Sequence, residues 1–258
     1  MADTTKKREQ ETMKPARAKG PNPRLTGKLC EHMTYAAREA FKRLRSSVIM
    51  AFPEEESRQC KVIGITSAQP SEGKSTVAVN LAYSLAELGK SVILVDGDMR
   101  RPSLHDKLGM RMVPGLSELL TTEDQVGAVV LSYKSSDGGT SFNMIPAGAI
   151  PGNPSELLNS RRFETLIEVL SSACDYIILD LPPVDAVVDA VTASKLTDGM
   201  IVVVRENNCP RYILDDCMEQ LQYAKANILG FVVNGSVEGA SKRYKYNRSY
   251  RYGYQYGK

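Results

Sequence analysis

The chain has 258 residues, 42% hydrophobic and 24% charged, which suits a soluble globular protein with one large α/β domain and a substantial core. Its five cysteines are widely spaced without a CxxC pair, which argues against a disulfide scaffold or a zinc site and for reduced thiols. No apolar run approaches the roughly 18 residues of a membrane span, and the polar N-terminus lacks a signal-peptide core, so we expect a cytoplasmic protein.

The net charge of +3 hides an asymmetry along the chain. Residues 1–30 carry +5 and residues 241–258 carry +6, which leaves residues 31–240 at −8. An acidic body attracts basic ends, its own or those of a neighbour, although charge alone also permits contact with anionic lipid or nucleic acid. We therefore divide the chain into a flexible basic arm (1–30), an α/β domain (31–240) and a disordered basic tail (241–258).

Hydrophobic periodicity predicts the elements in chain order. A helix is expected over residues 33–51, then a strand over 61–66 and an amphipathic helix over 76–88, ended by Gly89. Residues 145–158 form a loop-rich section with a helix starting near Ser155. Short, continuously apolar runs predict four more strands, buried in a parallel sheet, at residues 91–95, 176–179, 200–204 and 228–233. The alternation predicts one doubly wound, mostly parallel sheet with helices on both faces.

A phosphate-binding loop, AQPSEGKST, lies between the first strand and the second helix at residues 68–76. Gly73 lets the backbone approach phosphates, and the helix N-terminus supplies positive partial charge. Lys74 is expected to reach the β- and γ-phosphate oxygens, and the Ser75 hydroxyl to ligate Mg²⁺. The pattern departs from the usual motif at Ala68, where a glycine is typical.

Three carboxylates follow predicted strands. Asp96 and Asp98 are two residues apart, so both side chains can face one site, and Asp180 precedes two prolines that stop its strand. The carboxyl ends of parallel strands are where ligands bind in open α/β sheets, so we interpret these residues as Mg²⁺ and water ligands. With only two histidines in the chain, Asp96 or Asp98 is the candidate general base.

Several basic and amide side chains lie near the same strand ends. Arg100 and Arg101 follow the second strand and could neutralise phosphate charge or lie solvated at a helix start. Asn234 ends the last strand, where related folds bind adenine, although a turn-forming asparagine is also consistent. Arg205 could face nucleotide or solvent.

The C-terminal fifteen residues hold six of the twelve tyrosines and no aliphatic side chain, so we expect them to stay mobile and solvated. These six are Tyr244, Tyr246, Tyr250, Tyr252, Tyr254 and Tyr256. A phosphoryl-transfer site joined to such a segment suggests an enzyme that phosphorylates tyrosines on neighbouring copies of itself. The tail could otherwise stack on nucleic-acid bases or form an edge strand.

Three motifs together resemble the bacterial tyrosine kinases of capsule and exopolysaccharide biosynthesis. Residues 68–76 look like the Walker A motif of that family, VILVDGDMR (92–100) like its Walker A′ and IILDLPP (177–183) like its Walker B. The segment IPAGAIPGNPSELL and the tyrosine-rich terminus are also similar to the family. The resemblance implies a P-loop fold of the MinD/ParA-like class and an ATP- and Mg²⁺-dependent kinase that phosphorylates its own tail in trans, along with other cytoplasmic proteins.

The resemblance also implies roles for single residues. Gly73, Lys74, Ser75 and Thr76 would bind phosphates, with Asp96 as base and Asp98 and Asp180 organising the metal. A helix motif of the family builds a ring of subunits, and its three positions are here occupied by Glu39, Lys42 and Arg45. Lysine in the second position loses the bidentate guanidinium of arginine.

The single-chain form implies a separate membrane activator, a polysaccharide co-polymerase, which would hold the protein at the inner face of the membrane. Two other classes compete with this interpretation. A MinD- or ParA-like positioning ATPase shares the fold, but it carries a signature lysine where this chain has Gln69. A nucleic-acid-binding module fits the tail alone, and we expect no nucleic acid because of the nucleotide motifs.

Overall fold

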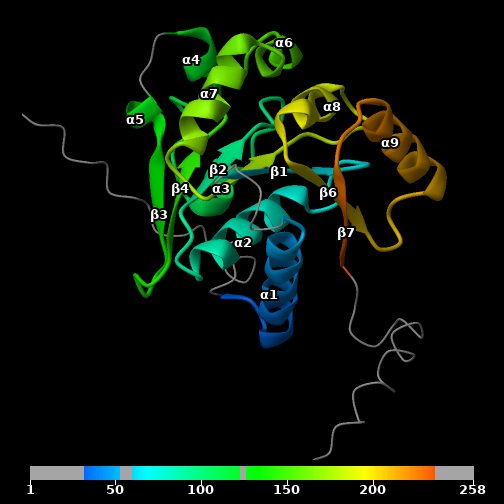
Figure 1. Cartoon of the computed structure of the whole chain (residues 1–258), viewed down its shortest axis with the longest axis horizontal. Coiled ribbons are helices and arrows are strands. Elements are labelled where there is room, and N and C mark those ends of the chain that lie inside the picture. The colour runs from blue at the N-terminus through cyan, green and yellow to red at the C-terminus, as the bar shows by residue number, and fades with distance from the viewer. Residues whose placement is uncertain (1–31, 53–59, 123–125, 236–258) are drawn as a thin grey trace, which may run out of the picture.

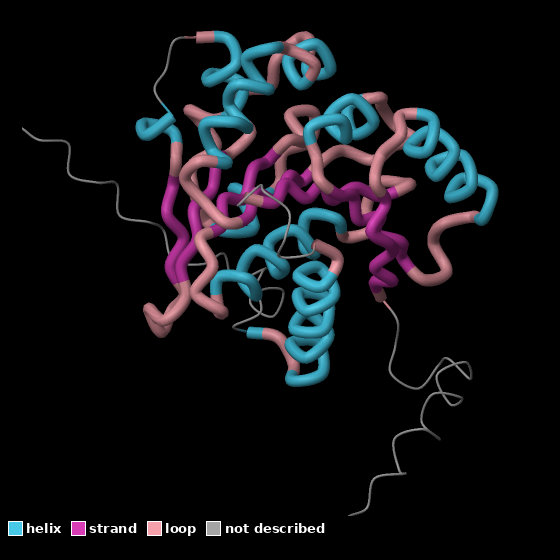
Figure 2. Tube along the Cα trace, in the orientation of Figure 1, coloured by secondary structure: helices cyan, strands magenta, loops and turns pink. Residues whose placement is uncertain are grey.

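The computed structural model describes residues 32–52, 60–122 and 126–235 (Figure 1). The predicted arm (1–30) and the predicted tail (241–258), with its six tyrosines, lie outside these residues. Within them the chain forms a sheet with helices on both faces, as Figure 2 shows with the strands in magenta. No helix in the described part of the chain is long and apolar enough to cross a membrane.

The sheet has seven strands in the order β3-β4-β2-β5-β1-β6-β7. All neighbours are parallel except β3 and β4, which confirms the predicted doubly wound, mostly parallel architecture. The strands are β1 (Lys61–Ser67), β2 (Val92–Asp96), β3 (Leu131–Lys134), β4 (Ser141–Ile145), β5 (Tyr176–Asp180), β6 (Gly199–Arg205) and β7 (Ile228–Asn234).

Helices cover the two faces of the sheet with separate hydrophobic clusters. One cluster contains side chains of α1, α2 and α3, and the other contains side chains of α4 to α9. Figure 1 shows α1 and α2 on one side of the sheet and α6, α7 and α8 on the other. The helices are α1 (Tyr35–Met50), α2 (Lys74–Ala86), α3 (Leu104–Leu108), α4 (Leu116–Thr121), α5 (Val126–Val129), α6 (Pro154–Leu158), α7 (Arg161–Ser171), α8 (Asp189–Ala193) and α9 (Arg211–Tyr223), with a 3₁₀ turn at Ser194–Leu196.

The helix α2 differs from the amphipathic prediction. Nearly all of its side chains are buried, because α1 covers the side that would otherwise face water. The helix ends at Ala86, and Leu88, which the prediction included in the helix, is 52% exposed. Gly89 has φ +76° and donates its N–H to the Ala86 carbonyl, so it terminates the helix as predicted.

Three strands also differ from expectation. The run at residues 228–233 was predicted to be a buried strand, but among the described residues β7 lies at an edge of the sheet, and Phe231 and Val233 are 50% and 59% exposed. The antiparallel pair β3 and β4 lies between the strands predicted at residues 91–95 and 176–179, where no strand was predicted. The predicted helix near Ser155 is present as α6, beginning at Pro154.

Candidate functional site

The motifs meet at the carboxyl edge of the sheet, by which we mean the end where β1, β2 and β5 finish. In the register of the sheet, Asp96 at the end of β2 lies beside Asp180 at the end of β5. The phosphate-binding loop follows β1, which lies on the other side of β5. Parallel pairing therefore brings the three sequence motifs together, although they are separated along the chain.

The loop bends through two residues with left-handed backbone conformation, Ser71 at φ +67° and Gly73 at φ +98°. Gly73 is the N-cap of α2, so the helix N-terminus begins at the loop as predicted. A Cβ atom on Gly73 would come within 2.1 Å of the Asn234 side-chain nitrogen. A glycine is therefore required here both by the backbone angle and by the lack of space.

Asn234, at the end of β7, and Glu72, within the loop, connect the loop to the neighbouring strand ends. Asn234 donates its side-chain N–H to the Glu72 carbonyl at 2.8 Å. The Glu72 carboxylate, fully buried, accepts hydrogen bonds from the backbone of Gln69 at 2.9 Å and of Arg205 at 3.3 Å. Asn234 thus lies at the phosphate-binding loop. Glu72 was not identified from the sequence, because the variable interior of the motif gives no signal for a buried carboxylate.

Lys74 lies at the centre of a compact charge cluster. Its ammonium group is 2.8 Å from Asp98 Oδ2, 3.4 Å from Asp180 Oδ1 and 3.4 Å from Ser75 Oγ. The Lys74 side chain is 11% exposed, that of Asp98 6% and that of Asp180 0%. Burial lowers the pKa of Lys74, but Asp180 and Asp98 outweigh it, and the net shift is upward. Lys74 is therefore charged, and four predicted residues are in contact.

Asp96 and Asp180 each keep one buried carboxyl oxygen without a hydrogen-bond partner, Asp96 Oδ1 and Asp180 Oδ2. The other Asp96 oxygen accepts from the backbone of Ser103 at 3.3 Å and of Leu104 at 3.1 Å. Burial, followed by the nearby Asp180, raises the pKa of Asp96 to about 8, and burial also raises the pKa of Asp180. The edge therefore holds carboxyl groups whose protonation is sensitive to any added cation.

The donor set fits a magnesium ion that arrives with a nucleotide. In residues 32–52, 60–122 and 126–235, no group of three or more His, Cys, Asp and Glu side chains could hold a metal by itself. Mg²⁺ in phosphate sites usually takes one or two carboxylates and completes its shell with phosphate oxygens and water. Ser75, Asp98 and Asp180, with the orphaned Asp180 oxygen, provide such a partial set.

Arg100 is not part of the Lys74 cluster. Its guanidinium group binds the buried Asp189 carboxylate through Nε at 2.9 Å and Nη2 at 3.2 Å, and Nη2 also donates to Ser155 Oγ at 2.9 Å. Ser155 in turn donates to Asp189. The network joins the segment after β2 to α6 and α8. Asp189 was not identified from the sequence, and a phosphate contact for Arg100 stays a prediction.

The remaining predicted site residues occupy the surroundings. Thr76 is partly exposed in the first turn of α2, and Arg101 is exposed with its backbone N–H donating to Asp98 Oδ1 at 3.0 Å. Arg205 ends β6, and its guanidinium group lies 3.5 Å from the Ser71 carbonyl. Arg205 therefore lies next to the loop.

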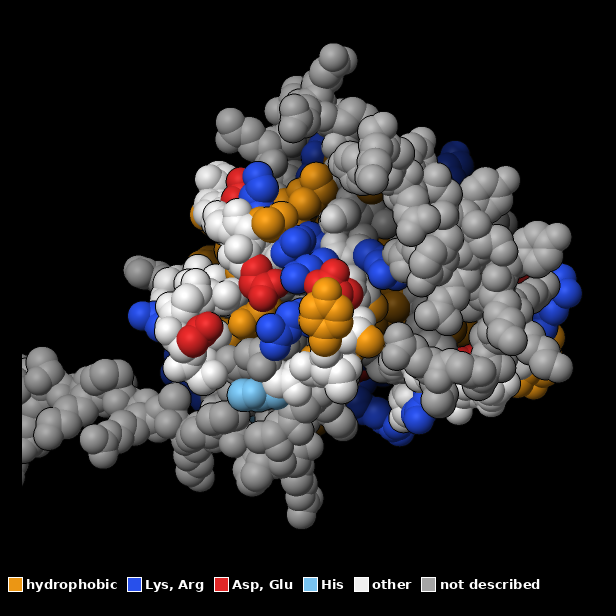
Figure 3. All heavy atoms as spheres, turned by 90° about the horizontal axis from the view of Figure 1, so that it is seen from below, with side chains coloured by type: hydrophobic (Ala, Val, Ile, Leu, Met, Phe, Trp, Pro, Cys, Tyr) orange, Lys and Arg blue, Asp and Glu red, His pale blue; other side chains and the backbone are white. Residues whose placement is uncertain are grey.

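The predicted ring residues lie on α1, away from the carboxyl edge. Lys42 and Glu39 pair with each other at 2.8 Å. Arg45 donates to the Ser84 carbonyl at 2.7 Å and lies 3.7 Å from Glu87, so it ties α1 to the C-terminal end of α2. Seen from below, on the side where α1 lies, basic and acidic side chains gather next to hydrophobic ones (Figure 3). The role of these three residues in a ring of subunits stays a prediction.

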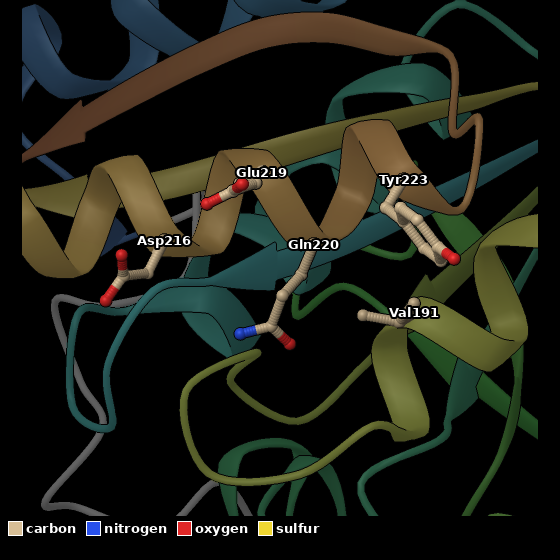
Figure 4. Close-up of a pocket in the computed structure, with 5 residues that line it drawn as sticks. All are labelled: Val191, Asp216, Glu219, Gln220 and Tyr223. Carbon is tan, nitrogen blue, oxygen red and sulfur yellow. The ribbon is translucent and has the colours of Figure 1, made fainter.

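A separate groove of about 510 Å³ lies between α8 and α9 (Figure 4). Its lining residues are Val191, Asp216, Glu219, Gln220 and Tyr223. None of the motif residues lines this groove, so the groove is distinct from the carboxyl edge.

Comparison with known proteins agrees with this geometry. Residues 60–228 match the model of a family described as an AAA domain. The tyrosine-protein kinase YwqD of Bacillus subtilis is 32% identical over 208 residues, which cover 81% of this chain and 85% of YwqD. The solved kinase domain of the Escherichia coli tyrosine kinase Etk is 31% identical with a TM-score of 0.72, covering 85% of this chain and 80% of that domain.

The match to full-length Etk covers only 28% of that protein. A more distant likeness shows the fold alone: the McdA–ATP complex from Cyanothece is 21% identical with a TM-score of 0.57, over 69% of this chain and 71% of McdA. It agrees with the doubly wound, mostly parallel fold predicted from the sequence. By sequence and by structure, the chain belongs to the family of bacterial tyrosine-protein kinases.

Proposed function

We propose that this protein is an ATP- and Mg²⁺-dependent kinase that phosphorylates its C-terminal tyrosine cluster in trans and thereby regulates capsule or exopolysaccharide synthesis. The observation that carries the proposal is the position of Lys74, between Asp98 and Asp180 at the start of α2. A buried cation between two carboxylates, under a loop of backbone N–H groups, is suited to receive a phosphate chain together with its metal ion.

The residues of the loop would bind and orient the nucleotide. Gly73 opens the backbone, Lys74 donates to phosphate oxygens, and Ser75 and Thr76 provide hydroxyl groups at the helix start. Ser75, Asp98 and Asp180 would hold Mg²⁺. When bound, the nucleotide supplies the transferable phosphoryl group and the metal neutralises its charge. We assign Asn234 to the shape of the loop, through its bond to Glu72, and Arg100 to the outer part of the site.

Asp96 is the proposed general base. Its raised pKa, about 8, lies closer to the ordinary value of a tyrosine phenol, about 10, than that of an exposed aspartate does. Without ligands the group is largely protonated near neutral pH, and the charge of a bound Mg²⁺ would favour the carboxylate form that accepts the phenolic proton. Its contribution should be smaller than that of Lys74, because positioning and charge neutralisation dominate a loose phosphoryl-transfer transition state.

The proposed substrate is the cluster of six tyrosines, which belongs to the residues that the structure does not describe. In the sequence the cluster follows β7, and the last residue of β7, Asn234, contacts the phosphate-binding loop. The likeness to bacterial tyrosine kinases supports transfer to the tail of a neighbouring copy and to other cytoplasmic proteins. Self-association through Glu39, Lys42 and Arg45, and attachment to the inner face of the membrane through a co-polymerase activator, belong to the same proposal.

A mixing experiment with the full-length chain and its activating segment tests both the chemistry and the trans reaction. One variant carries Lys74→Met with an intact tail, and the other carries an intact site with all six tail tyrosines changed to phenylalanine. Incubation of the mixture with ATP and Mg²⁺ should place phosphotyrosine on the tail of the Lys74→Met chain, whereas each variant alone should stay unlabelled there. Phosphotyrosine on Lys74→Met alone would refute the site. Nucleotide hydrolysis without any phosphotyrosine would instead favour a MinD/ParA-like ATPase.

A further inference from the structure

Two cysteines that are distant in the sequence meet at the opposite end of the sheet, which we call the amino edge because β1 and β5 begin there. The sulfur atoms of Cys60 and Cys174 are 3.7 Å apart. Cys60 directly precedes β1 and Cys174 lies two residues before β5. Cys60 is 1% exposed, whereas Cys174 is partly exposed.

The backbone beside the pair is fixed by the sheet. Lys61 N–H donates to the Asp175 carbonyl at 2.9 Å, so the ladder between β1 and β5 begins next to the two cysteines. The two sulfur atoms, 3.7 Å apart, have to approach to about 2.05 Å to form a disulfide, a short movement of the two side chains.

We propose that Cys60 and Cys174 are a modification site, a dithiol that a peroxide oxidises to a reversible disulfide between the segments that precede β1 and β5. The partly exposed Cys174 reacts first: its sulfur attacks one peroxide oxygen, the O–O bond breaks, and Cys174 sulfenic acid and water form. The Cys60 thiol then attacks the Cys174 sulfur, the S–O bond breaks and a second water leaves. Two thiols and one hydrogen peroxide thus give one disulfide and two waters.

The surroundings of Cys174 slow its oxidation by peroxide, but they favour the second step, the attack of Cys60 on the oxidised Cys174. The hydrogen bond with Cys60, together with burial, raises the pKa of Cys174, so little reactive thiolate is present at neutral pH. Once Cys174 is oxidised, however, the Cys60 sulfur is already in contact with it, and further oxidation of Cys174 has to compete with this step. Oxidation therefore ends at the disulfide.

The expected effect is stabilisation without a change at the nucleotide site. The bond would join residues 114 positions apart and so restrict the unfolded chain. β1 has seven residues, so its carboxyl end, where the phosphate-binding loop starts, is about 20 Å away along the strand.

The test uses the full chain, fully reduced and then treated with hydrogen peroxide. Remaining thiols are alkylated, and the digest is searched by mass spectrometry for the Cys60–Cys174 linked peptide. We expect this peptide together with a rise of several degrees in melting temperature, both reversed by dithiothreitol. Cys174→Ser should lose the linked peptide and the rise, whereas Cys209→Ser, a matched change outside the pair, should keep both.

Three results would overturn the proposal. These are alkylation of both cysteines after peroxide, oxidation of Cys174 beyond the sulfenic acid without a linked peptide, and linkage of either cysteine to Cys30, Cys209 or Cys217 in its place. Cys60→Ser provides a second variant that must also abolish the linked peptide. None of these readouts requires kinase activity, so they are independent of the function proposed above.

Discussion

The carboxylate groups at the two edges of the sheet differ in their hydrogen bonding. At the carboxyl edge, Asp96 and Asp180 each retain a buried oxygen without a partner. At the amino edge, Asp175 accepts from the Ser91 backbone at 2.7 Å and from its hydroxyl at 3.0 Å, and Asp198 accepts from the Val62 backbone at 2.6 Å. The sheet thus has acids with one unpaired oxygen at its carboxyl edge and acids that close backbone hydrogen bonds at its amino edge.

This difference separates groups held for binding from groups held for stability. A buried acceptor without a partner costs about 1–3 kcal/mol, so the carboxyl edge is destabilising until a ligand supplies the missing contacts. At the amino edge the polar groups close the ends of the ladder. We expect substitutions at the carboxyl edge to change activity more than stability, and substitutions at the amino edge to do the reverse.

The largest effect is expected for Asp180→Asn compared with Asp175→Asn. Asp180→Asn removes a charge beside Lys74 and the proposed metal position, and it should lower the tyrosine phosphorylation rate by at least about 100-fold. Asp175→Asn should leave the rate within about twofold but lower the free energy of unfolding by about 1 kcal/mol, because Ser91 loses a charged acceptor. Initial rates and denaturant unfolding measure both effects. Similar losses of activity in the two variants would contradict the separate roles of the two edges.

A smaller effect is expected at the two ends of β7. Asn234→Ala removes the bond to the Glu72 carbonyl, and we expect nucleotide binding to weaken about tenfold, or about 1.4 kcal/mol, equally for ATP and GTP. Calorimetric titration with both nucleotides measures this. The matched variant Asn227→Ala, which loses a bond to the Asp198 carbonyl at the amino edge, should bind as the parent does. A selective loss of ATP binding in Asn234→Ala would instead indicate that Asn234 contacts adenine.

The accuracy of prediction also differs between local motifs and long-range contacts. Lys74, Asp98 and Asp180 could be placed together because each ends or follows an apolar strand, Lys74 after a loop, and parallel strands end at one edge. The bond between Arg100 and Asp189 joins residues 89 positions apart, and the Cys60–Cys174 contact spans 114. Neither has a local pattern.

The errors in the fold have the same origin. An apolar run indicates a strand but not its place in the sheet. β7 was therefore predicted to be buried, although among the described residues it lies at an edge of the sheet. The amphipathic pattern assigned to α2 did not include the cover that α1 supplies. In both cases the missing information was which element packs against which, and this depends on tertiary contacts.

The pH dependence of stability provides another test of the buried acids at the carboxyl edge. Without nucleotide and Mg²⁺, the folded protein holds a proton on Asp96 up to its raised pKa of about 8, whereas the unfolded chain releases it near the ordinary value of 3.8. Stability should therefore fall as pH rises between these values. Asp96→Asn removes this penalty, so its melting temperature relative to the parent should rise by several degrees from pH 5 to pH 8.5. A constant or narrowing difference would contradict the raised pKa.

The smallest effect concerns α1, which lies outside both edges and provides a control for them. Arg45→Ala should lower the free energy of unfolding by about 1 kcal/mol, because the Arg45 side chain is only 12% exposed and bonds to the Ser84 carbonyl. Lys42→Ala should leave stability unchanged, since its pair with Glu39 is solvated. If α1 also forms the proposed ring, Lys42→Ala should shift the sedimentation coefficient without moving the melting temperature. Sedimentation that changes only in Arg45→Ala, in step with its lost stability, would mean that α1 supports the fold of α2 rather than assembly.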